Sequence, residues 1–208
     1  MKRLMIVILA ALCVAALLPQ TLSAGFGIKG GYSLSKFAAA SADPIPFTFG
    51  NLNSLVGGIY FSLGLGPLAI QPEVLYVRMG SEYKIDEANN VKWQFDYVQV
   101  PVLLKLKVIP VGPIRPVIYA GGYGAYLIKA NGVMTVDGVP GDGADISDEY
   151  QKYDYGVIGG VGLDFKLPGI TFSVEGRYNY GLKNILIDPA TGDSMKNRSM
   201  MALVGIGF

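Results

Sequence analysis

The stretch that decides the fold is residues 170–181, which read ITFSVEGRYNYG. Most even-numbered positions, from Ile170 and Phe172 to Tyr180, carry apolar or aromatic side chains, whereas the odd-numbered positions are mainly polar and include Glu175 and Arg177. A β-strand sends successive side chains to opposite faces. This stretch is therefore predicted to be a strand with one apolar and one polar face.

The same two-residue period recurs along the chain from Gly25 onward. It marks seven further segments, at about 25–35, 54–65, 68–82, 93–108, 114–128, 151–167 and 198–208. No segment of helical period separates them. Short connections rich in turn residues, at 64–67, 109–113 and 167–169, alternate with long polar ones, near 36–53, 83–92, 129–150 and 183–197. This alternation predicts an antiparallel up-and-down meander with all its short turns at one end.

Composition excludes several classes of protein. The chain has 208 residues, is 51% hydrophobic and 16% charged, and has a formal net charge of +1. High hydrophobicity with low net charge excludes intrinsic disorder, and the charge balance argues against nucleic acid as a partner. The chain contains no His, which excludes any mechanism that uses an imidazole as base or metal ligand.

The N-terminus has the layout of a secretory signal peptide. Lys2 and Arg3 precede the apolar run Leu4–Leu18, and small residues follow at 21–24. We expect residues 1–24 to be removed on export and residues 25–208 to form a single barrel domain. A permanent helical anchor is the alternative, but the run is short for a membrane-spanning helix. The single Cys, Cys13, lies within the run, so the mature chain would have no disulfide.

Two architectures fit the alternating strands. A soluble sandwich or lipocalin-like barrel would turn its apolar face inward, and a membrane barrel would turn it outward. The aromatic residues favour the membrane barrel, because two girdles bounding an aliphatic belt are typical of the membrane interfaces. The outer girdle would hold Tyr32, Tyr76, Trp93, Phe95, Tyr97, Tyr153, Tyr155, Tyr178 and Tyr180, and the periplasmic girdle Phe26, Phe165, Phe172 and Phe208. The predicted fold class is all-β: an eight-stranded antiparallel up-and-down transmembrane β-barrel with both ends in the periplasm.

Several motifs carry a family resemblance. The stretches 71–76 (QPEVLY), 97–105 (YVQVPVLLK), 119–123 (YAGGY), 154–156 (DYG) and 177–182 (RYNYGL) resemble the outer-membrane β-barrel (porin-like, OmpA/OmpX-like) family of Gram-negative bacteria. One departure is Gln99, where this family often has Glu. The resemblance covers essentially the whole mature chain. It implies a location in the cell outer membrane, with outer-membrane lipid around the barrel.

The last residue suggests an assembly signal. Phe208 ends an amphipathic strand and shares its apolar face with Ile206, Val204, Ala202 and Met200. A terminal aromatic in this setting resembles the signal that the outer-membrane assembly machinery reads, so that machinery is an expected partner.

The polar faces of the strands predict a charged lumen. Eight strands enclose an interior just wide enough for side chains. An ion-pair network is expected there from Lys29, Glu73, Lys105, Asp164, Glu175 and Arg177, and Lys107 and Lys166 lie on the same polar faces. Unpaired buried charges are costly, so the charges should pair. At this strand number a structural plug is favoured over an ion path.

The sequence offers no motif for a cofactor or a metal. The acidic residues in 137–149 match no EF-hand loop, and the glycine groups at 121–124 and 159–162 lie in strands and precede no helix. Enzymes of the resembled family need a His, which this chain lacks, so no enzymatic activity is expected. The expected role is structural or adhesive, with surface loops displayed from a side-chain-filled barrel. The alternative is a small porin or narrow channel for ions or small solutes. No motif names a partner for the loops.

Overall fold

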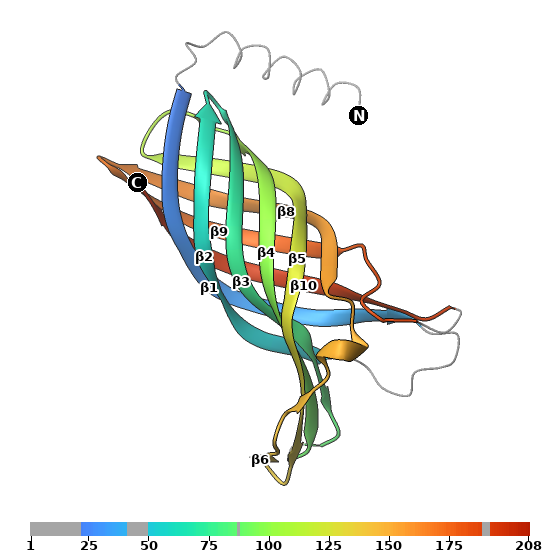
Figure 1. The fold of residues 1–208 in the computed structure, drawn as a ribbon. Helices are drawn as coiled ribbons and strands as arrows, with labels where there is room; N and C mark the ends of the chain where they lie inside the picture. The colour runs from blue at the N-terminus through green and yellow to red at the C-terminus, as the bar shows by residue number, and fades with distance from the viewer. Residues whose placement is uncertain (1–21, 41–49, 87, 189–191) are drawn as a thin grey trace, which may run out of the picture.

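The computed structural model describes residues 22–40, 50–86, 88–188 and 192–208. Most of the expected signal peptide, residues 1–21, lies outside this range. Eight long strands account for most of the described chain (Figure 1). They are β1 (Leu22–Ala40), β2 (Gly50–Leu65), β3 (Leu68–Lys84), β4 (Asn90–Lys107), β5 (Ile114–Val136), β8 (Tyr153–Leu167), β9 (Ile170–Gly181) and β10 (Ser194–Gly207). The connection between β5 and β8 adds β6 (Val139–Pro140), β7 (Ala144–Asp145) and the 3-10 turn η1 (Ser147–Glu149). Within the described ranges no helix is long and apolar enough to cross a membrane.

The eight strands form a closed antiparallel ring. Each long strand pairs with its neighbours in the sequence, with β5 next to β8. The first and last strands pair from Gly27↔Gly207 to Ala40↔Ser194, which closes the ring. Closure matters in lipid because an open sheet edge would leave backbone donors and acceptors without partners. The predicted fold class is confirmed.

The two ends of the barrel differ. The connections between β2 and β3, β4 and β5, and β8 and β9 are short, and we call their end the turn end. Gly66 and Gly169 adopt φ of 59° and 78° in two of these turns, a left-handed conformation that glycine adopts at little cost. The strand ends that lead into the long connections lie at the opposite end, the loop end. Membrane barrels place short turns in the periplasm and long loops outside, which orients the molecule.

The apolar face points outward, as predicted. On β9, Phe172 and Val174 are 41% and 52% exposed, whereas Ser173 and Glu175 are 5% and 2% exposed. The same alternation leaves large apolar side chains on the outside of the other strands, among them Phe26, Ile28, Leu55, Ile59, Ile70, Leu104, Val161 and Val204. A soluble barrel would bury these side chains, so lipid must cover them here.

The expected outer girdle is correct in part. Tyr32, Tyr76, Tyr153, Tyr155, Tyr178 and Tyr180 point outward. The prediction is wrong for Phe95 and Tyr97, which are 0% exposed inside the lumen, and Trp93 packs against the same buried cluster. All three share the odd-numbered face of β4 with Gln99 and Lys105. The alternation that directs Lys105 inward therefore carries the aromatic side chains inward as well.

Some strands continue beyond the ring at the loop end. The last pair between β5 and β8 is Tyr126↔Tyr153, but β5 continues beside β4 as far as Thr135↔Asn90. With the end of β3 and with β6, these segments form a projection at the bottom of Figure 1. We call residues 81–86, 88–96 and 127–140 the β-arm. The ends of β1 and β10 also pair with each other beyond their other neighbours.

Candidate functional site

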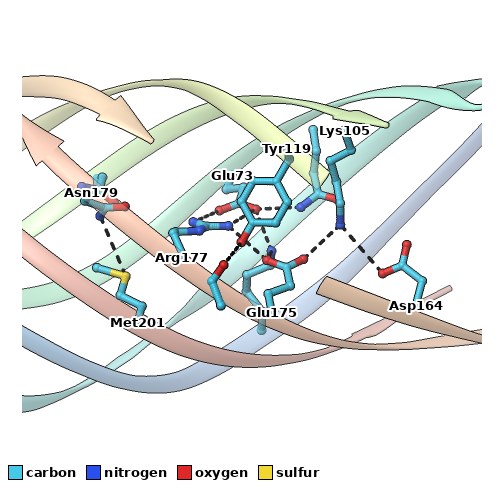
Figure 2. Close-up of polar contacts among 12 residues, drawn as sticks. Glu73, Lys105, Tyr119, Asp164, Glu175, Arg177, Asn179 and Met201 are labelled. Carbon is cyan, nitrogen blue, oxygen red and sulfur yellow. Dashed lines mark hydrogen bonds and ion pairs between the residues drawn. The ribbon is translucent and has the colours of Figure 1, made fainter. Parts of the chain in front are cut away.

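The lumen holds a compact charged cluster toward the turn end. Two carboxylates, those of Glu73 and Glu175, accept most of its hydrogen bonds, and Glu73 lies on β3. Arg177 on β9 grips this carboxylate with two parallel hydrogen bonds, Nη1 to Oε2 at 2.7 Å and Nη2 to Oε1 at 3.0 Å (Figure 2). Lys29 Nζ and Gln71 Nε2 each donate to Oε1 at 2.7 Å. Charge-assisted bonds of this kind, and bidentate pairs above all, are the strong ones.

Glu175 on β9 is the second of these two carboxylates. It accepts bonds from Lys29 Nζ at 3.0 Å, from Lys105 Nζ at 3.0 Å and from Arg177 Nη2 at 3.2 Å. Lys105 also lies 3.9 Å from Asp164 Oδ1. The six residues expected in the lumen therefore form one connected set of three cations and three carboxylates. All but Asp164 are at most 5% exposed, so the charges balance in a nearly dry site.

Sequence reasoning missed the neutral members of this cluster. The Arg177 guanidinium lies 5.5 Å from the centre of the Tyr119 ring and Lys105 Nζ lies 5.7 Å from it, while Lys29 Nζ lies 4.8 Å from the centre of the Tyr60 ring. Such contacts stabilise a cation that has lost water. Tyr119 is the cross-strand partner of Lys105, so the strand register was the signal that could have placed it.

A neutral and acidic layer follows toward the loop end. Asp154 Oδ2 accepts from Asn197 Nδ2 at 2.9 Å and from the Tyr123 hydroxyl at 3.4 Å. Asn197 Nδ2 also donates to the Tyr97 hydroxyl at 3.4 Å. Between this group and the charged cluster, Asn179 Nδ2 donates to Gln99 Oε1 at 3.4 Å and contacts Met201 Sδ at 3.9 Å.

An apolar layer closes the loop end of the lumen. The Phe95 ring is its centre and lies 5.3 Å from the ring of Phe37 and 4.5 Å from that of Tyr150. The surrounding buried side chains come from three strands and one loop: Val77 and Met79 of β3, Leu127 and Ala130 of β5, Met201 of β10, and Ile185. The loops are tied over this layer, since Gln151 N donates to Ile185 O at 2.9 Å. The layer leaves little room for a continuous water column.

A cavity of about 290 Å³ opens at the turn end, beneath the charged cluster. Lys107 and Lys166, which the polar faces placed in the lumen, line this cavity together with Arg115. Lys166 is exposed and Lys107 is only half-buried. These two lysines therefore belong to the mouth of the barrel rather than to its interior network.

The chemistry of the interior favours structure over catalysis. Opposite charges are paired at short distances and are screened from water. Among the described residues, no group of His, Cys, Asp and Glu side chains is arranged to hold a metal ion. Nothing in this lumen provides positive support for an enzymatic activity.

Several solved structures are similar to this chain. Neisserial surface protein A is 16% identical, with a TM-score of 0.48 over 90% of this chain and 97% of that one. The outer membrane protein OprG from Pseudomonas aeruginosa is 11% identical, with a TM-score of 0.50 over 89% and 95%. The attachment invasion locus protein Ail of Yersinia pestis is 11% identical, with a TM-score of 0.45 over 89% and 99%. The likeness to OprG shows a shared fold alone.

The sequence itself assigns the family. No curated protein matches it, but residues 19–186 match the family described as "Outer membrane protein beta-barrel domain". That match covers most of the chain and agrees with the closed ring and its apolar exterior. The chain belongs to this family of outer-membrane β-barrels, and its location is the outer membrane.

Proposed function

We propose that this protein has a structural or adhesive role: a side-chain-filled barrel that displays the β-arm and the neighbouring loops outside the cell. The observation that carries the proposal is the contrast between the two halves of the molecule. The charged cluster, the Asp154 layer and the Phe95 layer fill the lumen one after another. The strands, by contrast, continue past the ring and build a projecting surface.

The β-arm is suited to contact a partner. Ten residues of β5, 127–136, follow its last pair with β8, and at about 3.3 Å per residue they extend roughly 33 Å. The tip is held by backbone contacts, with Gly138 N donating to Ala88 O at 2.8 Å. Large apolar side chains are exposed there, namely Ile85, Met134, Val136 and Val139. An ordered arm loses less conformational entropy on binding than a flexible loop does.

Surface attachment tests the adhesive role. We expect cells that display the barrel to bind a host-cell or matrix surface, and the double variant Met134→Ser/Val139→Ser to lose most of that binding. Ile187→Ser is the matched control, because Ile187 is an exposed apolar side chain in a different loop. All variants are compared at equal amounts of folded protein, which is measured by heat-modifiable mobility on gels. Unchanged attachment in the double variant would remove the adhesive half of the proposal.

The second candidate, a narrow channel for ions or small solutes, draws support from one feature. Polar side chains line the lumen continuously from the turn-end cavity to Asp154. The Phe95 layer opposes this candidate, because apolar side chains close the path beyond that point. We expect the native barrel to show negligible conductance in planar bilayers. Steady conductance would favour the channel.

Export and assembly complete the proposal. We propose that residues 1–24 are removed and that Phe208 helps the assembly machinery to recognise the chain. The aromatic pair Phe26–Phe208 supports the second point, with ring centres 5.7 Å apart and each backbone N–H bonded to the other residue's carbonyl. N-terminal sequencing of protein extracted from outer membranes should begin near Gly25. A sequence that starts at Met1 would contradict removal.

A further inference from the structure

We propose that the turn-end cavity is a binding site for a phosphate-bearing anion. The cavity has a volume of about 290 Å³ with Ser23 and Ala24, which precede the expected start of the mature chain, in its lining. This is many times the roughly 10–15 Å³ that a single water needs. It opens toward the periplasm, on the side away from the β-arm. The inference is independent of the display role, because it concerns the opposite end of the barrel.

The charges that line the cavity do not balance. Lys107, Arg115 and Lys166 line it, and within the described ranges none of the three forms an ion pair. The one acidic side chain of the lining is Asp164, which faces Lys105 at 3.9 Å and is the cross-strand partner of Arg115. Lys105 and Asp164 already count in the balanced interior cluster. The mouth thus holds three cations that share no acidic side chain beyond Asp164.

Strand geometry brings these cations together. They lie at the turn ends of three adjacent strands, Lys107 on β4, Arg115 on β5 and Lys166 on β8. Lys107 is within electrostatic reach of Arg115 and Lys166, which repel it, and of Asp164, which attracts it. Its Nζ reaches toward the β2–β3 turn, 3.5 Å from where a Cβ on Gly64 would lie. Arg115 Nε is anchored on Gly112 O at 3.1 Å.

The rest of the lining supplies neutral donors. They are Tyr60 and Ser62 of β2, and Thr171 and Ser173 of β9, the strand next to β8. Hydroxyl groups donate to phosphate oxygens without adding charge. A concave site with charges of one sign focuses the field and concentrates counter-ions. Arg and Lys beside hydroxyl donors match the charge and the oxygen geometry of phosphate.

Phosphate of this kind has two sources in the periplasm. One is a soluble phosphate or diphosphate, and the other is the headgroup of an anionic phospholipid that bends over the rim. The rim is apolar near the cavity, with Val108, Ile109 and Val111 exposed in the β4–β5 turn. Lipid therefore lies close enough to be a competitor, and the experiment must separate the two sources.

Calorimetric titration with sodium pyrophosphate tests the site. The full-length barrel in a zwitterionic detergent should show saturable one-to-one binding that weakens in high salt. Arg115→Gln and Lys166→Gln should each weaken it about tenfold, since each removes a charge-assisted hydrogen bond. Lys166→Arg should restore it. Lys152→Gln is the control, because Lys152 is a lysine of the loop end and is far from the cavity lining.

Nanodiscs identify the source. Binding that is equal in phosphatidylcholine and phosphatidylglycerol discs supports the site with a soluble phosphate as its ligand. Binding that is lost only in phosphatidylglycerol discs supports the site with a lipid headgroup as its occupant. The proposal is overturned if pyrophosphate shows no saturable binding in micelles and phosphatidylcholine discs. It is equally overturned if Lys152→Gln weakens binding as much as Lys166→Gln does. Heat-modifiable mobility confirms that each variant is folded.

Discussion

Removal of the Arg177 guanidinium should destabilise the barrel more than removal of any exposed arginine. Arg177 is 3% exposed and makes three hydrogen bonds to two carboxylates. After Arg177→Ala the cluster would hold three carboxylates against two lysines. A buried pair broken on one side costs about 3–5 kcal/mol. Lys29 still contacts both Glu73 and Glu175, so we expect the low end, about 3 kcal/mol.

The chain supplies a matched control in Arg78. This residue also grips a carboxylate with two bonds, to Asp96 at 2.6 and 2.9 Å, but its side chain is 39% exposed. Arg78→Ala should therefore cost less than Arg177→Ala, although Asp96, which is 8% exposed, should raise the loss above the roughly 1 kcal/mol of a fully exposed pair. The assay is reversible urea unfolding of the barrel in lipid vesicles, followed by the fluorescence of Trp93, the single Trp, and by gel mobility.

A double variant separates charge imbalance from lost packing. Arg177→Ala/Glu73→Gln leaves Lys29 and Lys105 opposite Glu175 and Asp164, which is a balanced set. If uncompensated charge causes the loss of stability in Arg177→Ala, the double variant should be more stable than the sum of the two single changes predicts. Equal losses for Arg177→Ala and Arg78→Ala, together with additivity in the double variant, would refute the reasoning.

Three further outcomes follow from the strands. Phe208→Ser should lower the amount of heat-modifiable barrel in membranes. Phe172→Ser is the control and should not lower it, because Phe172 is an exposed Phe of the same rim. Equal effects of the two substitutions would argue against a terminal signal. Spin labels on cysteines at Phe172 and Ser173 should show lipid contact only at 172, and the reverse would mean an inverted register. Gly58→Ala should destabilise folding by about 1–3 kcal/mol, because its Cβ would lie 2.0 Å from a carbonyl oxygen of β3; Gly176→Ala, with open space around it, should be tolerated in the same unfolding assay.

The outward face of the barrel could be predicted because it depends on local order alone. On β9, Phe172 and Val174 alternate with Ser173 and Glu175, and strand geometry converts that alternation into two faces without any knowledge of neighbouring strands. The alternation of short turns and long loops along the chain predicted the antiparallel up-and-down order of the strands. The polar faces also named the residues of the charged cluster, because each lies on the same face as other polar positions of its strand.

The contents of each lumen layer depended on the strand register, which pairs residues far apart in the chain. Glu73 and Arg177 are 104 positions apart, and only closure of the ring brings them to 2.7 Å. The error at Tyr97 arose because its aromatic character suggested a membrane rim, although its parity matched Lys105. The sequence by itself determined which face of each strand meets lipid, since alternation is a local property. The tertiary structure alone decided which side chains meet inside, because contacts such as that between Glu73 and Arg177 form only once β1 pairs with β10. It also decided which cations remain unmatched at the mouth, because that depends on the pairing of β4, β5 and β8.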